Sequence, residues 1–208
     1  MLEAREALSR LREGNRRFAG GTPSSPERLS QARRAELAES QEPFAIVLGC
    51  SDSRVPAEIV FDQGLGDLFV IRVAGNIVAP SQVGSIEFAA ARFGTRLVVV
   101  LGHSGCGAVV ATLEDLRSPG PQSRNLRSIV DRVRPSVQKV VEARPDADYQ
   151  ELLQESVRAN IRFSVQQLRH ASPLLEQLLQ TDGLLVVGAE YSLQTGLVEF
   201  FDDTSGDT

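Results

Sequence analysis

The sequence predicts an α/β fold in which helices flank a mostly parallel central sheet, with an N-terminal helical arm and an edge extension at the C-terminus. Three runs of mostly apolar residues carry this prediction, at residues 44–49, 68–73 and 97–102. Strands buried on both faces, as in parallel sheets, are apolar throughout instead of alternating. A fourth run at 184–188 predicts one more strand. The length of 208 residues suits one core, so we expect a single domain.

The expected arm spans residues 1–40 and leaves residues 41–208 as the α/β core. Residues 2–19 have the pattern of an amphipathic helix, and its apolar stripe holds Leu8, Leu11 and Phe18. A second, polar helical stretch is predicted at 27–40. The stripe needs a surface to cover, and we expect the arm to lie outside the core.

Helical spacing predicts the elements between and after the strands. One helix lies between the second and third strands, ends at Gly94, and has these apolar positions: Val83, Ile86, Ala90 and Phe93. Three further helices are predicted at 108–116, 125–143 and 149–168, the second with a kink at Pro135. The tail at 190–200 reads as the edge extension, closed by a turn at Thr195 and Gly196.

Composition excludes several classes of protein. The 22 basic and 27 acidic residues give a net charge of -5 without long runs of one sign, which does not predict a nucleic-acid partner. No stretch approaches the ~20 apolar residues of a membrane span, and the start of the chain lacks the apolar core of a secretory signal. We therefore expect a cytoplasmic protein. Its two cysteines cannot form a disulfide framework and are available to a metal.

Cys50, His103 and Cys106 form a candidate metal site. Cys50 follows the first predicted strand and His103 follows the third, and ligand sites in open α/β sheets gather at the carboxyl ends of strands. Two thiolates and one imidazole suit zinc, with copper and iron as alternatives. The same cysteines also fit a structural role as small buried apolar residues, and spacing alone leaves both interpretations open.

Asp52 and Arg54 favour the metal interpretation. A carboxylate that either completes a zinc tetrahedron or pairs with an arginine would act as a switch on the fourth ligand position. The alternative is an ordinary surface ion pair with no role in chemistry.

The motifs CSDSRVPAEIVFDQGLGDLFVIRVAGNIV, IEFAAARFG and LVVVLGHSGCGAV resemble those of the β-class carbonic anhydrases over about residues 41–110. The resemblance implies a zinc enzyme that reversibly hydrates carbon dioxide to bicarbonate and a proton. It places zinc on Cys50, His103 and Cys106, and it makes Asp52 and Arg54 a dyad that orients the attacking hydroxide on zinc. In a closed state of the family, the aspartate becomes the fourth zinc ligand.

The resemblance also implies a substrate site. The substrate-orienting glutamine of the family falls on Gln41, and a backbone N–H near Gly107 would help to hold the substrate oxygens. The apolar pocket would include Phe69, Ala74 and Phe88. Ala74 stands where valine is frequent, and Phe88 where tyrosine is frequent, so the pocket is expected to be roomier or less polar.

Two further expectations come from the family. One branch has a tryptophan at the position of Val47, as part of an inhibitory bicarbonate site, and the absence of tryptophan here predicts a permanently open form with Asp52 on Arg54. The family commonly uses its N-terminal arm to wrap a second subunit, which predicts a homodimer or homotetramer.

Other functions remain to be separated from this one. Relatives of the family hydrolyse carbonyl sulfide or carbon disulfide with the same metal ligands, and the shape of the pocket would decide between these substrates. A non-catalytic zinc protein, in which Asp52 permanently closes the site, is the alternative from another class. His170, the only other histidine, is not assigned as a proton shuttle.

Overall fold

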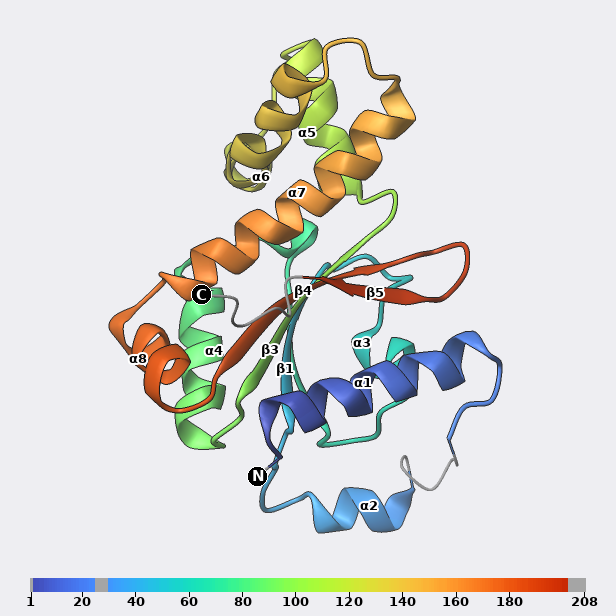
Figure 1. Ribbon diagram of the computed structural model, residues 1–208, viewed down its shortest axis with the longest axis vertical. Coiled ribbons are helices and arrows are strands. Elements are labelled where there is room, and N and C mark those ends of the chain that lie inside the picture. The colour runs from blue at the N-terminus through green and yellow to red at the C-terminus, as the bar shows by residue number, and fades with distance from the viewer. Residues whose placement is uncertain (1, 25–29, 202–208) are drawn as a thin grey trace.

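The core of the computed structural model is a five-stranded sheet (Figure 1), within the described residues 2–24 and 30–201. The strands are β1 (Ala45–Gly49), β2 (Leu68–Arg72), β3 (Leu97–His103), β4 (Leu185–Tyr191) and β5 (Val198–Phe201). Their order is β2-β1-β3-β4-β5. The first four strands are parallel, and β5 pairs antiparallel with β4. The predicted mostly parallel sheet and its C-terminal edge extension are confirmed.

Eight α-helices accompany the sheet in the described part of the chain. They are α1 (Ala4–Ala19), α2 (Gln31–Glu36), α3 (Ala57–Val60), α4 (Pro80–Arg92), α5 (Gly107–Arg117), α6 (Arg124–Ala143), α7 (Tyr149–Arg169) and α8 (Pro173–Thr181). A short 3-10 turn, η2 (Ala74–Asn76), follows β2. None of these helices combines the length and the apolar character that crossing a membrane requires.

Most of the predicted helices are present, with informative differences. The helix predicted at 125–143 is present as α6, with Pro135 inside it. The polar stretch at 27–40 contains only the short helix α2, and residues 27–29 lie outside the described residues. We did not predict α3 or α8. The start of α8 has clear local signals, because the Ser172 hydroxyl accepts a hydrogen bond from the Leu175 N–H and Pro173 occupies the first turn.

Successive residues of the strands face two different helical layers. In β1, Ile46 and Leu48 belong to a core cluster with residues of α4 and α7, whereas Ala45 and Val47 belong to a second cluster with residues of α1 and α3. Figure 1 shows α4, α7 and α8 on one side of the sheet and α1 on the other, with α5 and α6 beyond its upper end. The inner strands β1, β3 and β4 are therefore buried on both faces, which explains their mostly apolar sequence.

Helix α1 belongs to this core, although we expected an arm outside it. Leu8 and Leu11 are only 4% and 0% exposed and pack in the cluster that covers β1, β3 and β4. The Arg10 guanidinium lies 4.0 Å above the ring of Phe44 and pairs with Asp67. The apolar stripe of α1 is therefore already covered within one chain, because it packs on this face of the sheet.

We predict that Leu11→Ala lowers the free energy of unfolding by about 2–5 kcal/mol, because it leaves a cavity in a fully buried position. Urea unfolding monitored by circular dichroism measures this change. Leu126→Ala is the control, since Leu126 is 46% exposed and its loss should cost less than about 0.5 kcal/mol. Equal, small effects of both substitutions would contradict the placement of α1 in the core.

Candidate metal centre

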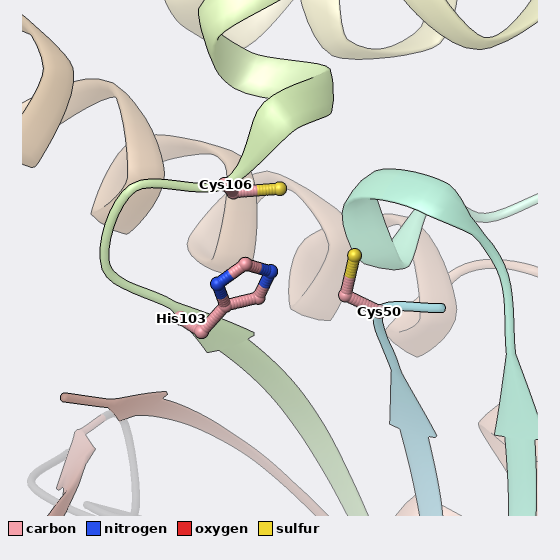
Figure 2. A group of neighbouring side chains, drawn as sticks. All are labelled: Cys50, His103 and Cys106. Carbon is pink, nitrogen blue, oxygen red and sulfur yellow. The ribbon is translucent and has the colours of Figure 1, made fainter. Parts of the chain in front are cut away.

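Parallel pairing of β1 with β3 brings three candidate ligands together. Gly49 is aligned with Leu101, so Cys50, directly after β1, lies beside the end of β3, where His103 is the last residue. Cys106 is the N-cap of α5, across a short turn from His103. The potential ligand atoms of the three residues lie within 4.8 Å of one another. Figure 2 shows both sulfurs and the imidazole directed into the same space.

The orientation of His103 fits a metal ligand. Its Nδ1 lies 3.0 Å from the carbonyl oxygen of Ser104, to which it donates when Nδ1 carries the proton. This tautomer leaves a lone pair on Nε2, which is buried and has no hydrogen-bond partner among the described residues. Buried polar atoms are seldom left unpaired, and a metal ion would satisfy this one.

Ser104 is itself tightly held. Its N–H donates to the carbonyl of Tyr191, and its hydroxyl accepts from the Leu193 N–H at 3.0 Å. The loop between β4 and β5 therefore fixes the carbonyl that orients His103. Although remote in sequence, the C-terminal hairpin supports the metal site.

The two cysteines are buried, and their shared environment favours one thiolate, on Cys50. The neighbouring Cys106 thiol has the largest influence and, together with the Gly75 N–H, lowers the pKa of Cys50 to about 4 although burial opposes this change. Cys106 keeps the proton of the pair, and the Cys50 thiolate raises its pKa. The N–H groups of Ala108 and Val109 point to the Cys106 sulfur and favour its ionised form.

This donor set fits zinc. Two sulfurs and one imidazole nitrogen are ligands that zinc accepts in a tetrahedron, and a fourth position is then available. The convergence of these atoms and the unpaired Nε2 of His103 are the structural observations that favour the metal interpretation over two inert cysteines.

Asp52 and Arg54 lie at the edge of the centre as a bidentate pair. The Arg54 Nε and Nη2 donate to the two carboxylate oxygens of Asp52 at 2.9 and 2.7 Å, as expected for the paired arrangement. The guanidinium holds the pKa of Asp52 well below its usual range. Oδ2 of Asp52 is 3.9 Å from Nε2 of His103, so the carboxylate borders the ligand cluster.

Arg72 is a supporting residue that we did not single out from the sequence. From the end of β2, its Nε donates to the Cys50 carbonyl at 3.0 Å and its Nη2 to the Asp52 carbonyl at 2.7 Å. One guanidinium thus fixes the backbone that carries both a ligand and the dyad carboxylate. The available signal was a charged residue within the apolar run at 68–73.

Two predicted substrate residues are adjacent to the ligands. Gly107 directly follows Cys106 and is the first residue of α5. Ala74 begins the turn η2, in which the next residue, Gly75, donates its N–H to the Cys50 sulfur.

The other three predicted substrate residues lie toward the opposite end of the sheet. Gln41 precedes β1, whose length of roughly 17 Å separates it from Cys50, and it lines a surface groove with Phe93. Phe69 is aligned with Ile46, in the amino-terminal half of β1. The ring of Phe88 lies 6.3 Å from that of Phe69 and meets that of Phe93 edge-on at 5.7 Å. One chain does not bring Gln41, Phe69 and Phe88 to its own metal centre.

Known proteins match this chain over most of its length. A family model described as carbonic anhydrase matches residues 45–198. A carbonic anhydrase of Mycolicibacterium smegmatis is 42% identical over 196 residues, which are 93% of this chain and 91% of that protein.

Solved structures share the fold. The Coccomyxa β-carbonic anhydrase is 28% identical, with a TM-score of 0.73 over 92% of this chain and 85% of its own. A β-carbonic anhydrase of Sordaria macrospora, described as tetrameric, is 25% identical, with a TM-score of 0.69 over 81% of this chain and 85% of its own.

We predict that Cys50→Ser abolishes stoichiometric zinc binding, because a serine hydroxyl is a far poorer zinc ligand than a thiolate. Metal content of the purified protein, measured by inductively coupled plasma mass spectrometry, checks this. The control is Ser51→Ala, which removes the exposed hydroxyl of the next residue and should leave zinc in place. Retention of zinc by the Cys50 variant would refute the assignment of this ligand.

Proposed function

The chain belongs to the β-class carbonic anhydrase family, and we propose that it catalyses the reversible hydration of carbon dioxide to bicarbonate and a proton. The observation that carries the proposal is the convergence of Cys50, His103 and Cys106 beside the Asp52–Arg54 pair. The names of the relatives favour carbon dioxide over carbonyl sulfide and carbon disulfide. These three ligands would hold the zinc ion.

Zinc, when bound, acts as a Lewis acid that makes a hydroxide nucleophile available near neutral pH. The role of Asp52 in this chemistry is to accept a hydrogen bond. Arg54 keeps its carboxylate ionised, so it accepts and does not donate, which would select one orientation of the attacking oxygen. The bidentate contact also prevents the carboxylate from turning freely.

Gly107 and Ala74 would contact the substrate. Gly107 is the first residue of α5, where its backbone N–H and the helix dipole would favour the negative oxygens of bicarbonate. Ala74 offers a small apolar surface beside the ligands, which suits carbon dioxide. We propose that the pairing of Asp52 with Arg54 is the resting state, since Val47, a buried β1 residue, stands where the other branch of the family has tryptophan.

A second copy of the chain would complete the substrate site. Gln41, Phe69 and Phe88 are distant from the metal centre of their own chain, and Phe88 is 55% exposed although it is a large apolar residue. Its ring lies against that of Phe69 in β2, the strand at one edge of the sheet. We propose a homodimer, or a homotetramer made of two such dimers, in which these residues approach the partner's centre. The tetrameric Sordaria relative supports this assembly.

The proposed activity predicts fast proton release when carbon dioxide is added to the protein. Stopped-flow mixing with a pH indicator measures this rate, and incubation with a zinc chelator should abolish it. A non-catalytic zinc protein would bind zinc and show no acceleration, which would overturn the proposed function.

We predict that Asp52→Asn lowers kcat by about 100-fold while zinc stays bound, because the amide fails to orient the attacking oxygen. Stopped-flow rates together with metal content check this. Asp182→Asn is the matched control, as Asp182 also pairs with an arginine, Arg96, away from the centre. Full activity of the Asp52 variant, or loss of its metal, would show that the residue has another role.

We predict that two inactive variants regain activity when their chains are mixed in one dimer. In a mixed dimer of Gln41→Ala and Cys50→Ser chains, one of the two sites has an intact Gln41 and an intact Cys50. About half of the dimers refolded from an equal mixture are mixed, so about a quarter of the wild-type activity should return. An equal mixture of Asp52→Asn and Cys50→Ser is the control, because both residues belong to the same chain's centre and no site becomes intact. Equal results for the two mixtures, or a monomer in sedimentation, would disprove the shared site.

A further inference from the structure

The turn η2 presents a backbone donor to the metal centre. The Gly75 N–H lies 3.4 Å from the Cys50 sulfur and donates to it. Gly75 and Asn76 both have positive φ, of 72° and 43°, and the Asn76 N–H closes the turn onto the Val73 carbonyl. For a non-glycine residue such as Asn76 this conformation is disfavoured, so it persists where surrounding contacts hold it.

The turn is also wedged between two helices. A Cβ atom on Gly75 would lie 2.9 Å from the Cβ of Ala108 in α5 and 3.3 Å from the Cγ2 of Val133 in α6. Both its conformation and this space require glycine. Because α5 and α6 pack closely against Gly75, the turn is held from its other side, through hydrogen bonds to its carbonyl groups.

Two side chains of α7 bind those carbonyls. The Asn160 amide Nδ2 donates to the Gly75 carbonyl at 2.8 Å, and the Ser164 hydroxyl, one helical turn later, donates to the Asn76 carbonyl at 3.1 Å. Both residues are buried. The Ser136 hydroxyl of α6 donates to the Val133 carbonyl at 2.7 Å and lies 3.5 Å from the Asn160 Oδ1, so the amide is also enclosed on that side.

We infer that Asn160 is a positioning residue for the zinc ligand Cys50. It touches neither the metal nor the substrate, and acts by holding the Gly75 N–H in line with the Cys50 sulfur. A hydrogen bond to a ligand atom fixes the direction of that ligand and moderates the charge it gives to the metal, and its loss weakens metal binding. The inference rests on the proposed function in taking Cys50 as a zinc ligand, and it does not depend on the dyad.

The test is Asn160→Leu, which keeps the approximate shape of the side chain and removes the donor. Zinc release to a chromophoric chelator should become about 10-fold faster or more. In the cobalt(II)-substituted protein, the sulfur-to-cobalt charge-transfer bands should shift, a change that a loss of packing alone would not cause. Both measurements are independent of enzymatic turnover.

Ser156→Ala is the matched control. Ser156 is also fully buried on α7, about one turn before Asn160, but its hydroxyl has no hydrogen-bond partner among the described residues, so its loss should leave zinc release and the cobalt spectrum as in the wild type. If the Asn160 variant does not fold, Ser164→Ala removes the second donor and should accelerate release to a smaller extent.

The inference would be overturned if the folded Asn160 variant released zinc at the wild-type rate and kept the wild-type cobalt spectrum. If only the Ser164 variant folds, the same result in that variant would overturn it. The same change in the Ser156 control would also overturn it. A wild-type protein that binds no zinc would instead defeat the proposed function, and the two failures are therefore distinguishable.

Discussion

The parallel pairing of β1 with β3 is the contact on which the metal centre depends. It aligns Gly49 with Leu101 and so places Cys50 beside the end of the strand that carries His103. The two residues are distant in sequence, and no local structure could bring them together. Burial of both faces of these strands under helices stabilises the pairing, and the ligands at the end of the strands are therefore held in fixed positions.

The sequence was sufficient for the strands and for the ligand triad, because both have local patterns. Uninterrupted apolar runs report burial on two faces. Cys50 and His103 each follow such a run directly, so the general rule for the carboxyl edge of a parallel sheet predicts their meeting. The alternative of inert cysteines could be set aside only when the structure showed the convergent atoms and the unpaired Nε2 of His103.

Features that depend on long-range packing were not predictable from one sequence. An apolar stripe such as that of α1 indicates that the helix covers a surface, but it does not indicate whether that surface belongs to the same chain. Arg72 and Asn160 resemble any arginine at a strand end or any asparagine in a helix. Only their contacts with the Cys50 carbonyl and the Gly75 carbonyl reveal that they support the centre. The separation of Gln41 from Cys50 likewise emerges from the direction of β1.

Cys106 is both a candidate ligand and the residue at which α5 begins. An ion held by Cys50, His103 and Cys106 would therefore be a cross-link between the end of β1, the end of β3 and the start of α5. The tie encloses residues 51–102, which include β2 and α4. Such a closure would restrict the unfolded chain as a disulfide does, so an ion bound at this site would also raise the free energy of unfolding of the protein.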